Sequence, residues 1–192
     1  MLCEVAVFDL DGTLARHGSL VGFARHLAGA RGSLAALARG VAGSGVPPRR
    51  EAFKRAALGD LLRDRSAAEV RARGRIYAER TLSHRMRPGM EARVDGHRDA
   101  GHRLVLVTMA LDVYVEPLAE RLGFEATLSP RVEIVDDRCT GRFLDDDLVG
   151  DGKAAALLRL LERRGWEPAR LHVYGDSNAD APLYELATEL NV

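Results

Sequence analysis

Four aspartates stand at two places in this sequence where their carboxylates could act together. Asp9 and Asp11 follow an apolar stretch and are separated by one residue, whereas Asp176 and Asp180 lie near the other end of the chain. Carboxylates that share one small space repel one another unless a cation neutralises them. A set of oxygen ligands suits Mg²⁺, which keeps several waters and shares its coordination with phosphate oxygens. If the fold gathers the four carboxylates, the sequence predicts a magnesium site that handles phosphate.

Three further residues could complete such a site. Thr108 closes an apolar run, and Lys153 stands at the start of a predicted helix as one of only two lysines beside 26 arginines. A hydroxyl and an ammonium group are donors of the kind that hold the oxygens of a transferred phosphoryl group. Gly12 lets the backbone turn sharply and approach a ligand closely. The six histidines lack the spacing of a zinc site, so the carboxylates form the predicted metal centre.

The pattern of apolar residues predicts a scaffold that would bring these side chains together. Short buried strands are expected at residues 2–8, 103–108, 124–128 and 170–174. Helices are expected at about residues 89–100, 111–122, 154–165 and 180–189. Strands that alternate with helices indicate an α/β fold with a parallel sheet and right-handed crossovers. Ligands bind at the carboxyl ends of such strands, where Asp9, Thr108 and Asp176 stand.

A helical segment interrupts this α/β pattern. Residues 18–86 contain no strand pattern, and their apolar spacing predicts helices at about 20–27, 34–41, 49–63 and 66–82. Further along, residues 131–135 and 139–143 are predicted to form a hairpin. The chain is therefore expected to combine an α/β core with an inserted all-helical subdomain.

Charge divides the chain at the boundaries of the helical segment. The formal net charge is zero, with 28 basic and 28 acidic residues. Residues 15–87, however, contain 16 basic and 5 acidic side chains, a net charge of +11, and the remainder carries −11. Such asymmetry indicates two structural units with different partners. We therefore expect a core domain of residues 1–14 plus 88–192 and a basic helical cap of residues 15–87.

Composition excludes several classes of protein. The chain has 192 residues, of which 46% are apolar and 29% are charged, as in a globular protein with one good-sized core. No run approaches the ~20 apolar residues that a membrane span needs, and the first residues lack the basic region of a signal peptide. Cys3 and Cys139 are too few for a disulfide framework. A cytoplasmic protein without a membrane partner is the expectation.

The motifs, in their order along the chain, resemble those of the haloacid dehalogenase superfamily. Asp9-Leu10-Asp11-Gly12-Thr13 resembles its first motif, Thr108 its second and Lys153 its third. The segment Gly175-Asp176-Ser177-Asn178-Ala179-Asp180 resembles its fourth. The resemblance implies a Rossmann-like core, and the helical insert resembles the small cap of the class IB subfamily that contains phosphoserine phosphatase. Members usually add a strand and a helix after the fourth motif, but only three residues follow the last predicted helix here, so either the sheet lacks an element or the sequence is truncated.

The resemblance also implies a role for each motif residue. Asp9 would attack phosphorus and form an aspartyl-phosphate, and Asp11 would act as the general acid and then as the general base. Mg²⁺ would be held by the Asp9 carboxylate, the Asp11 backbone carbonyl and Asp176, with Asp180 at or beside the metal. The phosphoryl oxygens would be bound by residues of the first three motifs, namely Gly12, Thr108 and Lys153.

The helical cap offers one further candidate for contact with the substrate. Lys54, on the predicted helix 49–63, resembles a basic position of class IB caps; the alternative is a solvated helix face. Phosphoserine phosphatases carry a glutamate a few residues after the first motif, and residues 14–19 contain no acid, which puts phosphoserine in doubt as the substrate. The net charge of +11 on residues 15–87 predicts a small phosphate ester with extra anionic character.

Two other functions remain open at this point. The same aspartyl-phosphate chemistry could pass the phosphoryl group to an alcohol instead of water, which would make the protein a phosphotransferase. Alternatively, the basic cap could bind a polyanion while the phosphatase core is vestigial. Nucleic acid is disfavoured as that polyanion because the basic segment lacks interleaved aromatic residues. The sequence predicts neither the exact substrate nor the oligomeric state.

Overall fold

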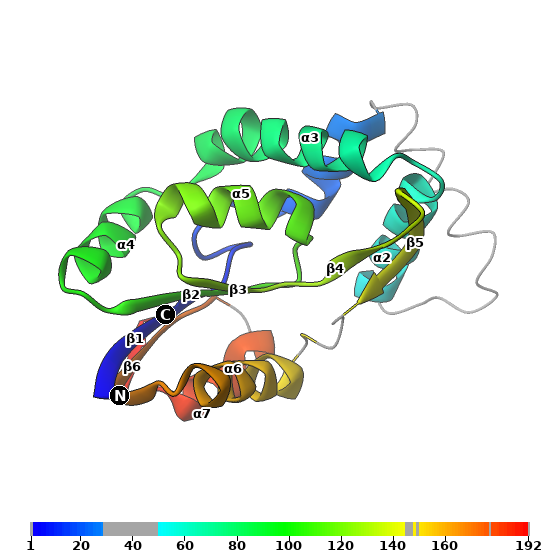
Figure 1. Ribbon diagram of the computed structural model, residues 1–192. Coiled ribbons are helices and arrows are strands. Elements are labelled where there is room, and N and C mark those ends of the chain that lie inside the picture. Colours follow the sequence, from blue (N-terminus) through cyan, green and yellow to red (C-terminus); the bar gives the residue numbers. More distant parts are fainter. Residues whose placement is uncertain (1, 29–49, 145–147, 149, 177, 192) are drawn as a thin grey trace.

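A five-stranded parallel sheet forms the centre of the computed structural model (Figure 1). The structure describes residues 2–28, 50–144, 148, 150–176 and 178–191. The strand order is β3-β2-β1-β6-β7, so the N-terminal strand lies in the middle. The strands are β1 (Leu2–Phe8), β2 (Arg103–Val107), β3 (Ala126–Leu128), β6 (Glu167–Tyr174) and β7 (Glu189–Asn191). The predicted α/β class with a parallel sheet is confirmed.

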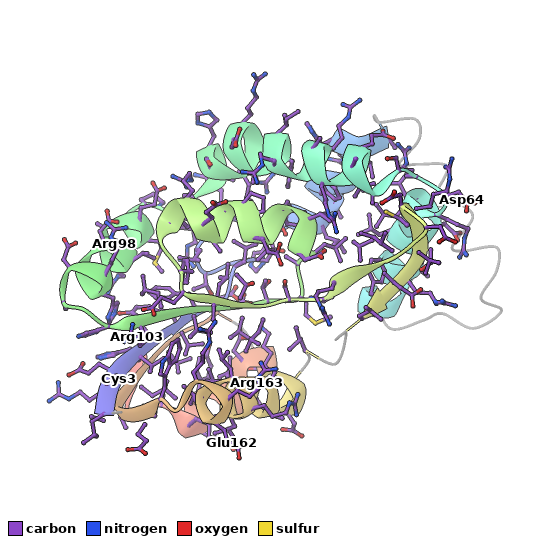
Figure 2. The ribbon with its side chains drawn as sticks, in the orientation of Figure 1. Cys3, Asp64, Arg98, Arg103, Glu162 and Arg163 are labelled. Carbon is purple, nitrogen blue, oxygen red and sulfur yellow. The ribbon has the colours of Figure 1, made fainter. Side chains whose placement is uncertain are left out.

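Helices cover both faces of this sheet (Figure 1). The helices α4 (Met90–Asp99) and α5 (Asp112–Leu122) lie on one face, and α6 (Asp151–Arg164) and α7 (Ala181–Leu186) lie on the other. Side chains of β1 alternate between the two apolar cores, with Phe8 in the first and Val7 in the second. Exposed charged residues such as Glu162 and Arg163 lie on the outer side of α6 (Figure 2).

The helical insert packs over α5. It contains a helix at residues 19–28, α2 (Arg50–Leu62) and α3 (Ala67–Tyr77), and α3 lies across α5 on the side away from the sheet (Figure 1). The prediction of one helix over 66–82 was incomplete, because the α-helix gives way to a π-helical turn at Ala78–Leu82. The helix predicted at 34–41 lies outside the described residues. The domain boundaries themselves stay a prediction.

The predicted hairpin is confirmed and forms a separate two-stranded sheet. Its strands β4 (Arg131–Val135) and β5 (Arg138–Leu144) are antiparallel, and both turn residues, Asp136 and Asp137, have positive φ angles of 49° and 60°. Such angles are those of a type I′ turn, whose twist matches that of paired strands. Cys139 in β5 exchanges backbone hydrogen bonds with the segment just after α2, so the hairpin is joined to the helical insert.

The end of the sheet differs from the prediction. The last helix was expected to reach residue 189, but α7 ends at Leu186 and the chain continues as β7, which pairs in parallel with the end of β6. The Thr188 hydroxyl accepts a hydrogen bond of 2.7 Å from the backbone N–H of Leu171 and fixes the approach of β7. A three-residue strand is too short to produce an alternating pattern, so its pairing could not be detected in the sequence.

Two further features bear on function. Among the described residues, none of the helices is long and apolar enough to cross a membrane. The histidines lack the spacing of a zinc site in the sequence, but the fold brings His172 next to His97 and His102, which are five residues apart.

Candidate active site

The loop after β1 builds the first part of the site. The backbone N–H of Asp9 still donates to the carbonyl of Tyr174 at 2.9 Å, as a continuation of the sheet. The chain then turns at Gly12, whose φ angle is +97°. A β-carbon at this position would overlap with the Asp176 carboxylate, so only glycine allows the first loop to lie against the fourth motif. The tight turn therefore sets Asp9 and Asp11 at the carboxyl end of the central strand.

A buried cluster of three carboxylates and one ammonium group lies at this edge of the sheet. Carboxylate oxygens of Asp9, Asp176 and Asp180 all lie within 4.8 Å of one another. The Lys153 ammonium, at the start of α6, donates to Asp9 at 2.8 Å and to Asp180 at 2.5 Å. Asp9, Asp180 and Lys153 are at most 7% exposed, whereas Asp176 is more open to solvent.

Burial changes the protonation of this cluster. It raises the pKa of the Asp9 carboxyl to about 6, and the neighbouring Asp180 acts in the same direction, while Lys153 opposes both. Burial by itself would lower the pKa of Lys153, but the attraction of the two carboxylates outweighs it and raises that pKa. Lys153 is therefore charged at neutral pH, and the cluster still has more acids than bases.

Asp11 is held by a residue that the sequence analysis did not single out. The Ser19 backbone N–H and hydroxyl donate to its two carboxylate oxygens at 2.9 and 2.5 Å. The Tyr114 hydroxyl lies 3.2 Å from the Ser19 hydroxyl and must be the donor there, because the Ser19 proton points to Asp11. Tyr77, in α3, donates to the Ser19 carbonyl at 2.9 Å. A buried chain of polar groups thus runs from the helical insert to Asp11.

The remaining predicted residues fall around the same edge, with one exception. Thr108 follows β2 directly, is buried, and accepts a hydrogen bond of 3.1 Å from the backbone of Ala110. Arg87 donates to the carbonyl of Gly12. Lys54 falls within α2, but its side chain is not among those that the structure describes, so its contact with substrate stays a prediction.

Two more side chains lie near the cluster. His17 is exposed, yet its Nε2 atom lies 3.1 Å from Asp176. The Tyr184 side chain, in α7, has its pKa raised by burial first and then by Asp180, Asp176 and Asp9. No local pattern marks either residue, although Ser19 could have been noticed as a serine at the first turn of a predicted helix.

The donor set fits the ion that the sequence predicts. Asp9, Asp176 and Asp180 offer only oxygen atoms, and hard oxygen ligands are those of Mg²⁺. Burial raises the pKa of Asp9, and the charges of Asp180 and Asp11 add to this effect; a bound cation would relieve the repulsion among these carboxylates.

The comparisons with known proteins agree with this geometry. Residues 6–185 match the family of haloacid dehalogenase-like hydrolases. The chain belongs to this family. The match spans the described strands from β1 to β6 and includes every residue of the candidate site, so the resemblance seen in the motifs is confirmed.

Relatives of this chain include a named phosphatase. The phosphoserine phosphatase SerB1 of Mycobacterium tuberculosis is 32% identical over 96% of this chain and 63% of its own length. The protein CicA of Caulobacter vibrioides is 30% identical over 96% of this chain and 83% of its own length. The chain thus spans less than two thirds of the mycobacterial relative.

Solved structures share the fold of this chain. A protein of unknown function from Bordetella pertussis Tohama I is 26% identical, with a TM-score of 0.82 over 99% of this chain and 89% of its own. A phosphoserine phosphatase solved as a phospho-aspartyl intermediate analogue has a TM-score of 0.66 over 99% of this chain and 86% of its own. Its identity is 19%, so this likeness concerns the fold alone.

Proposed function

We propose that this hydrolase is a Mg²⁺-dependent phosphatase that cleaves a small phosphorylated metabolite through an aspartyl-phosphate on Asp9. The observation that carries the proposal is the buried cluster in which Lys153 bonds Asp9 and Asp180 beside Asp176, next to a second carboxylate, Asp11, held by Ser19. Two carboxylates with different surroundings are what a nucleophile and a general acid need. Family membership and the relative named phosphoserine phosphatase support the same class of reaction.

In this mechanism Asp9 is the nucleophile. Its carboxylate attacks phosphorus, and the bond from phosphorus to the leaving oxygen breaks in the same displacement. The Lys153 ammonium, 2.8 Å from Asp9, favours the ionised carboxylate and can donate hydrogen bonds to the phosphoryl oxygens. Thr108 lies at the end of the neighbouring strand, where its hydroxyl can donate to the same oxygens.

Asp11 is the general acid and then the general base. It protonates the leaving oxygen of the ester and later removes a proton from the water that hydrolyses the aspartyl-phosphate. The two hydrogen bonds from Ser19 fix the direction of its carboxylate, so Ser19 acts as a positioning residue. Mg²⁺ bound by Asp9, Asp176 and Asp180 would neutralise the charge that builds up on the phosphoryl oxygens.

Basic side chains near the first loop support an anionic substrate. Arg87 donates to the carbonyl of Gly12, and Arg85 donates to the carbonyl of His17 at 2.6 Å. These guanidinium groups and the net charge of +11 on residues 15–87 raise the local concentration of anions. A substrate with a second anionic group is therefore favoured over a simple phosphate ester.

The test is a screen of phosphorylated metabolites for release of inorganic phosphate, with and without Mg²⁺, on the wild type and on Asp9→Asn. We expect Mg²⁺-dependent release that Asp9→Asn abolishes, with the highest rates on substrates that carry a second anionic group. Phosphate release by Asp9→Asn at the wild-type rate would overturn the mechanism. Alcohol acceptors added to the same assay separate hydrolysis from phosphotransfer, because a transferase forms a new phosphate ester in place of free phosphate.

A further inference from the structure

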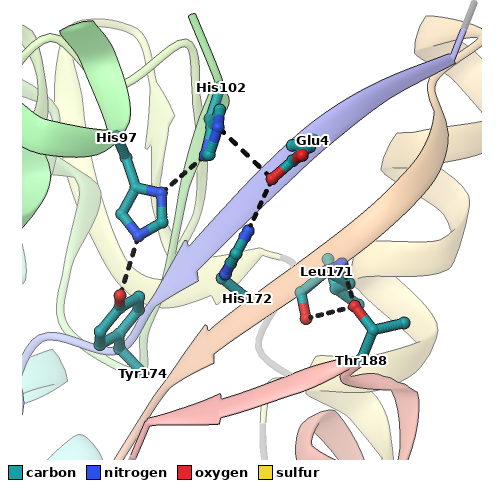
Figure 3. A network of polar contacts seen from close by, with 7 residues as sticks. All are labelled: Glu4, His97, His102, Leu171, His172, Tyr174 and Thr188. Atoms are coloured by element: carbon teal, nitrogen blue, oxygen red, sulfur yellow. Dashed lines mark hydrogen bonds and ion pairs between the residues drawn. The ribbon is translucent and has the colours of Figure 1, made fainter. Parts of the chain in front are cut away.

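A second cluster of potential metal ligands lies on one face of the sheet (Figure 3). It consists of His97 in α4, His102 between α4 and β2, and His172 in β6, with Glu4 of β1 beside them. One ring nitrogen from each histidine lies within 4.8 Å of the others. Three segments of the chain therefore contribute one imidazole each to the same small volume. We call this group the histidine cluster.

The distances within the histidine cluster are short. The Nδ1 atoms of His97 and His102 are 2.8 Å apart. The Glu4 carboxylate lies 3.0 Å from Nε2 of His172 and 3.4 Å from Nε2 of His102 (Figure 3). His172 is only 7% exposed, and the rings of His102 and His172 are stacked. The cluster therefore holds three imidazoles close together, with Glu4 and Tyr174 as polar neighbours.

The sheet register explains why these residues meet. Ala6 of β1 is paired with His172 of β6, and Glu4 lies two residues before Ala6, so Glu4 and His172 project from the same face. This is the face that α4 covers, which adds His97. The neighbouring strand β2 begins directly after His102. The gathering thus follows from the pairing of strands and not from an accident of side-chain rotation.

The outer contacts of the histidine cluster suit a metal site. The Glu4 carboxylate lies 3.0 Å from Nε2 of His172, and a carboxylate that bonds an imidazole N–H is a common support of a metal-ligating histidine. The Nε2 atom of His97 lies 2.8 Å from the Tyr174 hydroxyl, the kind of outer contact that orients a ligating imidazole.

We propose that His97, His102 and His172 bind a divalent transition-metal ion, with Zn²⁺ as the best match. Three imidazoles and one water complete the four ligands of a tetrahedral zinc site. Neighbouring ligand atoms of such a site are about 3.3 Å apart, given zinc–nitrogen bonds of about 2.0–2.1 Å. The Nδ1 atoms of His97 and His102 are 2.8 Å apart, and one ring nitrogen from each of the three histidines lies within 4.8 Å of the others, so small shifts of the side chains would admit the ion. Glu4 lies against Nε2 of His102, the nitrogen that faces away from His97, and would be an outer contact of the site.

This site is separate from the aspartate cluster. Glu4 precedes Asp9 by five residues of extended chain, and at about 3.3 Å per residue the two lie roughly 16 Å apart. The two sites also differ in ligand chemistry, because imidazole selects zinc-like ions and carboxylates alone select Mg²⁺. Bound Zn²⁺ would tie α4 to β6, which matters because Val94 is the one fully buried residue of that helix.

The experiment measures Zn²⁺ binding to the full chain after chelator treatment, in a large excess of Mg²⁺ that fills the aspartate site. We expect one Zn²⁺ per chain and a higher melting temperature with Zn²⁺ than without it. His102→Gln should weaken binding more than about 100-fold, whereas Tyr174→Phe, which removes only an outer contact, should weaken it about 10- to 100-fold. His84→Gln is the matched control, because His84 is exposed and outside the cluster, and it should bind as the wild type does.

Several results would overturn the proposal. Zn²⁺ that is displaced by Mg²⁺, or whose binding survives His102→Gln but is lost in Asp176→Asn, occupies the aspartate site instead. A wild type that takes up no Zn²⁺ also contradicts it. If His102→Gln fails to fold, Co²⁺ bound to the wild type decides, because tetrahedral nitrogen and oxygen ligation gives intense visible absorption and an octahedral aspartate site gives weak absorption.

Discussion

The ammonium group of Lys153 lies 2.8 Å from the Asp9 carboxylate, and both side chains are almost fully shielded from water. The same group lies 2.5 Å from Asp180. One cation thus serves two buried acids that come from opposite ends of the chain. A buried charge without its partner is strongly unfavourable, so this contact ties the integrity of the site to the stability of the fold.

Replacing Lys153 by methionine should therefore lower both stability and activity. The variant leaves Asp9 and Asp180 buried without their cation, and we expect the free energy of unfolding at pH 8 to fall by about 3 kcal/mol or more. Urea denaturation measures this directly. Adding Asp180→Asn to the variant removes one of the two acids and should recover part of the loss. If Lys153→Met alone is as stable as the wild type, this account of the buried cluster is wrong.

Replacing Ser19 by alanine should slow turnover while leaving substrate affinity unchanged. The variant loses the 2.5 Å hydrogen bond to Asp11 but keeps the one from the backbone N–H, so the general acid is present but poorly oriented. A hydrogen bond to a charged group contributes about 1.5–3 kcal/mol, so kcat should fall roughly 10- to 100-fold. Ser83→Ala is the control, because that hydroxyl bonds only the Ala78 carbonyl. Equal kinetics of the two variants would rule out a positioning role for Ser19.

Gly12→Ala should abolish activity because of a steric overlap. The same substitution at a second glycine, Gly89, separates this overlap from backbone strain. Gly12 and Gly89 have similar φ angles of +97° and +81°, so alanine at either position costs about 1–2 kcal/mol of backbone strain. Only at Gly12 would the new β-carbon also overlap with Asp176, whereas the space around Gly89 is open. We expect Gly89→Ala to keep its phosphatase activity and Gly12→Ala to lose more than about 100-fold. Similar activities of both would contradict this view of the first loop.

Stability should depend on pH through Asp112, at the start of α5. Burial raises the pKa of this carboxyl to about 6, against hydrogen bonds from the backbone of Val132 and Val113 that lower it. Because the folded state favours the protonated form of Asp112, this carboxyl contributes to the free energy of unfolding fully below about pH 4. The contribution is lost as the pH rises through 6. Asp112→Asn imitates the protonated acid and should be more stable than the wild type at pH 8 by about 1–2 kcal/mol. At pH 4 the difference should vanish; a difference that is the same at both pH values would refute the assignment.

Much of the site could be predicted from the sequence because parallel sheets place strand ends together. Asp9, Thr108 and Asp176 each follow a strand, so their convergence required only the correct fold class. Lys153 was recognisable because the chain has only two lysines and this one stands at the start of a clear amphipathic helix. The position of each of these residues at the end of a strand or the start of a helix was enough to predict, from the fold class, that they meet.

Other features depend on contacts that no local pattern records. Ser19 reaches Asp11 only because the chain folds back after Gly12, and its partner Tyr114 is 95 residues away. His97 and His172 meet because α4 covers the face of the sheet from which His172 projects, and not because of their spacing in the sequence. The strand β7 is three residues long and takes its conformation from pairing with β6. In each case the contact forms only in the folded chain. In the sequence these residues are isolated polar residues or a short final segment without a pattern.

The central claim is that Asp9 carries the phosphoryl group, and the most direct measurement is to find that group on the protein. The wild type is mixed with a ³²P-labelled substrate from the screen and Mg²⁺, quenched in acid within one turnover, digested, and mapped by mass spectrometry. We predict label on the peptide that contains Asp9 and no labelled peptide from Asp9→Asn. Label on a different residue, or turnover by the wild type with no labelled protein at any time point, would contradict the mechanism.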